Sequence, residues 1–136
     1  MGVVVDTSVW IDIERKRLTH THVAERIGND AVYLAPPVVA ELEYGVSRAK
    51  TDAQRNRRAS ALAKIMRKPC LLVDKETGEM FGRLAAELDA SGKPARHRVN
   101  DIWIAAMAIQ HGFKVLTCNE ADFADIPGLD VIAIQP

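Results

Sequence analysis

Short apolar runs alternate with longer amphipathic stretches along the whole chain. A short apolar, β-branched run is typical of a strand buried on both faces of a parallel sheet, whereas the longer stretches repeat apolar residues at helical spacing. The pattern predicts strands at 3–5, 31–35, 70–73 and 113–117, and a candidate edge strand at 131–134. It predicts helices at 9–17, 20–28, 36–46, 52–66, 75–90 and 99–111.

The alternation of strands with helices indicates an α/β fold, a three-layer α/β/α sandwich around a central, mostly parallel sheet. We expect a single domain over residues 1–136, because a chain of 136 residues can bury one ordinary core. The helix at 99–111 is apolar over most of its surface, so we expect it to be largely buried.

Polar side chains with oxygen ligands recur where the predicted strands end or the next helices begin. The set is Asp6, Glu41, Asp101, Asn119 and Asp122. In an open α/β sheet, ligands bind in the crevice at the carboxyl ends of the strands. Taken singly, Asp6 is explained as a helix N-cap and Glu41 as an acid favoured by the helix dipole. The recurrence favours a shared pocket instead.

Several carboxylates in one pocket repel one another and tend to protonate, unless divalent cations neutralise them. Oxygen ligands select Mg²⁺ or Mn²⁺, and Mg²⁺ usually takes one or two protein carboxylates together with water and phosphate oxygens. The sequence shows no nucleophilic Cys and no Ser-His arrangement. The pattern therefore indicates phosphodiester hydrolysis by metal-activated water, with one or two ions.

The charged residues are distributed unevenly along the chain. Formal net charge is zero, but a basic stretch runs from Arg48 to Lys68 against the single acid Asp52. This stretch is either a solvated helical face or a phosphate-binding surface, and the sequence leaves both open.

Cys70 and Cys118 form no metal-ligand motif and are expected to be buried apolar residues. With no secretory signal or spanning segment, we expect a soluble, cytoplasmic protein.

Four segments, in order and nearly end to end, resemble the PIN domains, specifically the VapC toxin family of type II toxin–antitoxin systems. They are residues 4–12 (VVDTSVWID), 39–45 (VAELEYG), 100–106 (NDIWIAA) and 116–123 (LTCNEADF). The resemblance implies a Mg²⁺-dependent (or Mn²⁺-dependent) endoribonuclease that acts as the toxin, with an RNA substrate, a cognate antitoxin that occludes the acidic groove, and a homodimer.

The resemblance also assigns roles to residues. Asp6, Glu41 and Asp101 match three of the family's four metal-binding acids. The fourth is open between Asp122 and Asn119, because Asn119 stands where many PIN domains carry Asp. Residues that would orient the acids and metal-bound water are Thr7, Ser8, Asn100 and Thr117, although helix capping explains Thr7 and Ser8 equally well. Candidates for RNA-backbone contacts are Arg48, Arg55, Arg58, Arg96 and Arg98.

Two other functions compete with the nuclease. A catalytically weak PIN-like module that only binds RNA or protein would explain Asn119 as a sign of decay. A phosphotransfer protein or phosphatase would use Asp6 as nucleophile, but haloacid-dehalogenase-like enzymes need a second Asp where this chain has Ser8. Receiver-like domains need a late Lys, which is missing after the fourth predicted strand. Neither phosphotransfer alternative explains Glu41 and Asp101.

Overall fold

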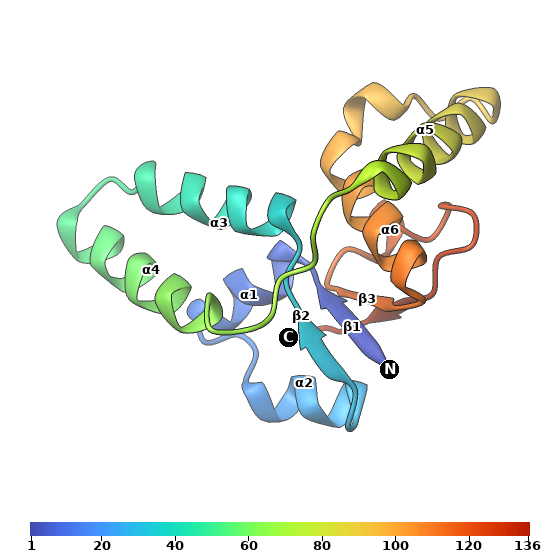
Figure 1. Ribbon diagram of the computed structural model, residues 1–136. Helices are drawn as coiled ribbons and strands as arrows, with labels where there is room; N and C mark the ends of the chain where they lie inside the picture. Colours follow the sequence, from blue (N-terminus) through green and yellow to red (C-terminus); the bar gives the residue numbers. More distant parts are fainter.

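A computed structural model describes all residues, 1–136, and shows a four-stranded sheet in the order β2-β1-β3-β4 with every neighbouring pair parallel (Figure 1). The strands are β1 (Gly2–Val5), β2 (Ala31–Tyr33), β3 (Lys114–Thr117) and β4 (Val131–Ala133). The expected α/β fold around a central parallel sheet is confirmed. No helix is both long enough and apolar enough to cross a membrane.

Six α-helices and two short 3-10 turns connect the strands. They are α1 (Thr7–Glu14), α2 (His20–Ile27), α3 (Pro36–Ser47), α4 (Asp52–Ile65), α5 (Lys75–Ala90), η1 (Ala95–His97), α6 (Val99–His111) and η2 (Glu120–Asp122). The α3–α4 hairpin extends to one side of the sheet, and the paired helices α5 and α6 lie on the other side in Figure 1. The predicted helices are therefore all present, with small shifts at their ends.

The core is built on β1 and α6, as the apolar patterns predict. Val3, Val4 and Val5 have no exposed surface, and α6 buries six of its residues, including Ile102 and Ile104. Helix α6 packs against both β1 and β3. Because β1 and β3 pair in parallel, with Val5 opposite Leu116, they end at the same edge of the sheet. The residues that follow each strand are thereby brought together.

The predicted strand at 70–73 is wrong. Only an isolated bridge joins Leu34 to Cys70, and the chain then runs as coil to the start of α5. The side chains of this run face different surroundings: Leu71 is buried, whereas Leu72 is 78% exposed and Cys70 is also exposed. A central strand needs neighbours on both sides, and this segment pairs only with Leu34, the residue that follows β2. The expected burial of Cys70 is wrong for the same reason.

Candidate functional site

Asp6 is the most enclosed acid of the site. It leaves β1 directly, is 7% exposed, and stands at the N-cap of α1 without making a side-chain capping bond. Its Oδ2 instead accepts hydrogen bonds from Ser8 Oγ at 2.8 Å and from Thr117 Oγ1 at 2.9 Å. The carboxylate is therefore held by two hydroxyls rather than used to start the helix.

Those hydroxyls are themselves fixed by the loop after β3. Ser8 Oγ accepts from the backbone N–H of Cys118 at 3.1 Å, and Thr117 Oγ1 accepts from that of Asn119 at 2.9 Å. Each hydroxyl therefore accepts from one backbone N–H and donates its own proton to Asp6. The capping role considered for Ser8 is not what the structure shows.

The Thr117→Val substitution tests this arrangement. Thr117 is fully buried, and valine has the same shape but leaves the Asn119 N–H without its acceptor and Asp6 without one donor. We expect the free energy of unfolding to fall by about 1–3 kcal/mol, as measured by urea denaturation. Thr117→Ser, which keeps the hydroxyl, is the matched control and should lose clearly less. Equal losses in the two variants would contradict the hydrogen-bond account.

Glu41 and Asp101 both line an open cavity of about 420 Å³, which Glu41 borders together with residues 96–101. Glu41 comes from α3, and its Oε1 accepts a hydrogen bond from Thr7 Oγ1 at 3.0 Å. The pKa of Glu41 is raised by loss of hydration and by the charge of Asp6, against the lowering effect of the Thr7 hydrogen bond. Thr7 thus links α1 to the second acid of the site, which is not a capping role.

Asp101, in the first turn of α6, carries the clearest electrostatic signature of the site. Its pKa is raised from 3.8 to about 6, first by burial and then by the negative charges of Asp122, Asp6 and Glu41, against a smaller lowering effect of the Arg98 charge. A carboxyl group whose pKa is raised by the charges of three other carboxylates lies within the electrostatic field of all three. The structure therefore brings together the four acids that were predicted from positions far apart in the sequence.

None of these acids is neutralised by a basic side chain. The ion pairs of the chain use other carboxylates: those of Asp12, Glu14, Asp30, Asp52, Glu79 and Asp125. An acidic cluster without partners is costly to keep ionised and is the arrangement that a divalent cation relieves.

The donor set does not form a ready-made cage for a metal ion. As the side chains stand, no group of three or more Asp, Glu, His or Cys residues is close enough together to hold one. Mg²⁺ does not require one, because it keeps several waters and binds through one or two carboxylates. Glu41 and Asp101 line the open cavity, and Asp6 and Asp122 act on Asp101 through their charges. This set of oxygen ligands, without a salt-bridge partner, fits such a partly hydrated ion.

The two candidates for the fourth metal ligand lie in the loop after β3. Asp122 is the last residue of η2 and Asn119 is the residue before η2, and both side chains are exposed. Asp122 is the strongest charged influence on Asp101, whereas Asn119 is fixed through its backbone N–H. Asn100 lines the cavity but does not cap α6, whose N-cap residue is Arg98.

The basic residues predicted to touch RNA are distributed unevenly. Arg96 lines the acidic cavity and is exposed, with its Nε 3.2 Å from His97 Nε2. Arg48 donates to the Tyr44 hydroxyl, and Arg58 donates to the backbone carbonyl of Gly45. Arg55 is paired with Asp52, and Arg98 with Asp125. Only Arg96 and Arg98 lie at the acids.

An apolar groove that sequence reasoning did not identify adjoins Glu41. It lies between α1, α3 and α4, encloses about 150 Å³, and is lined by Trp10, Ile11, Leu42, Leu62 and Ile65 among others. The Trp10 indole N–H is buried without a hydrogen-bond partner. The helical spacing of these apolar residues was visible in the sequence, but it did not separate a groove from ordinary core packing.

Comparison with known proteins gives consistent relatives. The family described as "PIN domain" matches residues 3–129. Ribonuclease VapC5 of Mycobacterium tuberculosis is 36% identical over 132 residues, covering 96% of this chain and 92% of its own length. Ribonuclease VapC1 of Rickettsia felis is 32% identical over 137 residues, covering 99% and 98%.

Solved structures agree with these relatives. The chain is similar to one in the VapBC-5 toxin–antitoxin structure from Mycobacterium tuberculosis, with a TM-score of 0.79, 28% identity, and coverage of 98% of this chain and 100% of that one. It also shares the fold of a chain in the DNA-bound VapBC2 structure from Rickettsia felis, with a TM-score of 0.85, 23% identity, and coverage of 99% and 100%.

Proposed function

The chain belongs to the PIN domain family, and we propose that it is a Mg²⁺-dependent endoribonuclease, the toxin of a type II toxin–antitoxin system. The observation that carries this proposal is the set of four acids that share one field and have no cationic partner, with the pKa of Asp101 raised to about 6. Relatives named as ribonucleases, at more than 30% identity over nearly the full chain, support the same activity.

Asp6, Glu41, Asp101 and Asp122 would hold the metal, with Asn119 as the alternative fourth ligand. When bound, Mg²⁺ or Mn²⁺ would supply charge neutralisation at the phosphate and lower the pKa of a bound water. The chain's own contribution is orientation. Asp6 is fixed by Ser8 and Thr117, and Glu41 is fixed by Thr7. Fixed carboxylates reduce the reorganisation needed in the transition state.

RNA would enter over the rim of the cavity, where Arg96 is exposed next to the acids. Its guanidinium offers a phosphate contact within reach of the cleavage site. The Arg48, Arg55 and Arg58 side chains already make contacts within α3 and α4, so their proposed part in binding the RNA backbone is secondary.

Cleavage of a fluorescent RNA in the presence of Mg²⁺ or EDTA tests the proposal directly. We expect cleavage with Mg²⁺ and none with EDTA, and restoration when Mg²⁺ is added in excess. Sequencing the 5′ ends of RNAs cut in cells after induction would then identify the target. RNA binding without cleavage under any metal condition would favour the catalytically weak binding module instead.

The apolar groove beside Glu41 is the surface we propose for the antitoxin. Its lining combines apolar side chains with two basic and two acidic ones, Arg15, Arg58, Glu14 and Glu41, so it suits a segment that carries apolar residues and charges of both signs. A segment seated there would reach Glu41 and close the acidic cavity. The solved neighbours are toxin–antitoxin complexes, which supports an antitoxin partner of this kind.

The Ile65→Lys substitution tests the groove. Ile65 lines it and is partly buried, whereas Ala63 in the same helix is exposed and does not line it. We expect Ile65→Lys to weaken binding of the cognate antitoxin by at least about tenfold in calorimetry, because a buried apolar contact is replaced by a charge. Ala63→Lys is the matched control. If both variants bind like the unsubstituted chain, the antitoxin binds elsewhere.

A homodimer in the cytoplasm completes the proposal. Exposed apolar side chains, including Leu72 at 78%, Val73 at 50% and Val99 at 43%, offer surface that association would remove from water. Light scattering coupled to size exclusion measures this state. The two cysteines are free, which fits a reducing compartment.

A further inference from the structure

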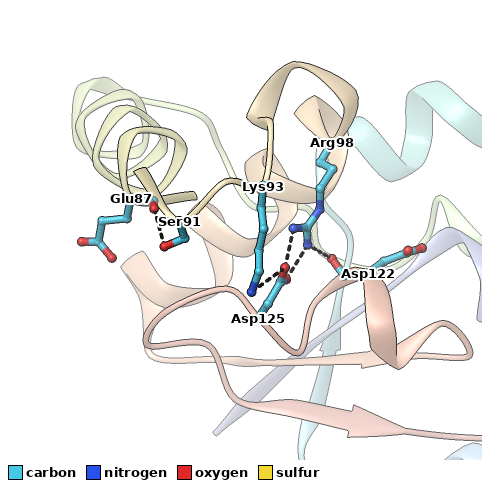
Figure 2. A network of polar contacts seen from close by, with 6 residues as sticks. All are labelled: Glu87, Ser91, Lys93, Arg98, Asp122 and Asp125. Carbon is cyan, nitrogen blue, oxygen red and sulfur yellow. Dashed lines mark hydrogen bonds and ion pairs between the residues drawn. The ribbon is translucent and has the colours of Figure 1, made fainter. Parts of the chain in front are cut away.

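Arg98 binds the loop that carries Asp122 through a forked contact. Figure 2 shows the guanidinium pointing to the Asp125 carboxylate and to the backbone at Asp122. Arg98 Nη1 donates to Asp125 Oδ2 at 2.8 Å, and Nη2 donates to Asp125 Oδ1 at 2.7 Å. Nη2 also donates to the backbone carbonyl of Asp122 at 2.5 Å. One side chain thus joins the helix of Asp101 to the turn of Asp122.

This pair differs from an ordinary surface ion pair. The side chains of Arg98 and Asp125 are 18% and 24% exposed, and the contact is bidentate. Two parallel N–H···O bonds fix the guanidinium plane as well as its position. The Arg98 hydrogen bonds lower the pKa of Asp125, so the carboxylate stays charged at neutral pH. Lys93 approaches the same carboxylate only at 3.6 Å and is half exposed.

The bidentate contact with Asp125 also fixes the position of the positive charge of Arg98. Asp101 and Asp122 both act on Arg98 through their charges, so the guanidinium lies within their field. Arg98 nevertheless forms its ion pair with Asp125 and leaves both acids of the cavity unpaired. A guanidinium released from Asp125 would remain in the field of those two carboxylates and would be free to pair with them, which would neutralise the site.

We propose that Asp125 is a positioning residue that holds Arg98 away from Asp101 and Asp122, and so keeps these carboxylates open for a divalent cation. The inference rests on the proposed function, because it concerns the same acidic site. It differs from the RNA-backbone role predicted for Arg98 from the sequence, since the fork of Arg98 is used within the chain.

Mn²⁺ binding to the full chain, measured by calorimetry at pH 7 without RNA, tests this. The informative variants are Asp125→Asn and the double variant Asp125→Asn with Arg98→Met. Asp125→Asn should bind Mn²⁺ about tenfold more weakly, because Arg98 then competes for the acids. The double variant should return to within about threefold of the unsubstituted chain, because the competing charge is gone.

A purely structural role would give the opposite order. If the fork only braced the loop, removing both partners would bind Mn²⁺ as weakly as Asp125→Asn or more weakly, and the inference would be overturned. Unchanged Mn²⁺ affinity in Asp125→Asn would also overturn it. Phe123 and Ile126, at 1% and 3% exposure, anchor the loop independently, and thermal unfolding checks that each variant is folded.

Two controls separate this inference from the proposed function. Lys93→Met removes the other cation near Asp125 and should change Mn²⁺ affinity less than about twofold. Asp6→Asn should abolish Mn²⁺ binding in any case. If the unsubstituted chain binds no Mn²⁺, or Asp6→Asn binds it equally well, the metal site itself is wrong. If both controls behave as expected and Asp125→Asn binds normally, only the role of Asp125 is wrong.

Discussion

The Asp101→Asn variant is expected to lose Mg²⁺-dependent RNA cleavage by at least about 100-fold and to unfold at a higher temperature than the unsubstituted chain when no metal is present. The loss of activity follows because Asp101 would bind the metal from the centre of the four acids. The gain in stability follows because the ionised Asp101 is partly buried in the field of Asp122, Asp6 and Glu41. The same charge is needed for function and unfavourable for the metal-free fold.

The pH dependence of this effect has a definite sign. The pKa of Asp101 is about 6 in the folded chain, above its ordinary value of 3.8. Between about pH 4 and 6 the folded state therefore binds more protons than the unfolded chain, so stability falls as pH rises through this window. Because Asp101 is partly exposed to solvent, we expect Asp101→Asn to raise the free energy of unfolding by about 1 kcal/mol at pH 7 and by almost nothing at pH 4.

Asp130→Asn is a suitable control, because this exposed aspartate lies outside the site and should alter neither property. Urea denaturation at pH 4 and pH 7, with a fluorescent-RNA assay on the same samples, provides the measurements. Retention of full cleavage by Asp101→Asn would refute the assignment of Asp101 to the metal site. A lower unfolding free energy at pH 7 would refute the electrostatic account of its pKa.

The sequence predicted the parts of this fold that depend on local pattern. An apolar run such as Val3 to Val5 is stable only as a central strand that is buried on both faces. In the structure it forms β1, between β2 and β3, and has no exposed surface. The run at 70–73 has a similar composition but makes only one bridge, to Leu34 just after β2. Apolar composition alone does not reveal whether a second neighbouring strand exists, which is why this prediction failed.

The acids could be placed from sequence because parallel strands end at one edge of the sheet. Their partners could not. Thr117 binds Asp6 across 111 positions of sequence, and the pairing depends on the register of β1 with β3. From the sequence, Arg98 could equally have faced solvent or RNA. Only the three-dimensional path of the loop after η2 shows that Arg98 donates its hydrogen bonds to Asp125. Side-chain partners between distant segments are thus a property of packing.

Divalent cation is expected to raise the unfolding temperature strongly at pH 7 and much less at pH 5. An ion at 100 times its dissociation constant stabilises the folded state by about 2.7 kcal/mol, which for a domain of this size corresponds to about 10 °C. At pH 5 the Asp101 carboxyl is largely protonated, because its pKa is about 6, and protons compete with the metal for it.

Differential scanning calorimetry with Mn²⁺ and with EDTA at the two pH values measures this difference, and we expect the rise at pH 5 to be less than half of that at pH 7. The rise at pH 7 is set by the free energy of binding, which already includes relief of the repulsion among the ionised acids. Asp101→Asn weakens this binding, so its unfolding temperature should respond weakly to Mn²⁺ at either pH. Equal rises at both pH values in the unsubstituted chain would mean that the ion binds away from Asp101. A strong response retained in Asp101→Asn would lead to the same conclusion, because a site that needs this carboxylate cannot work without its charge.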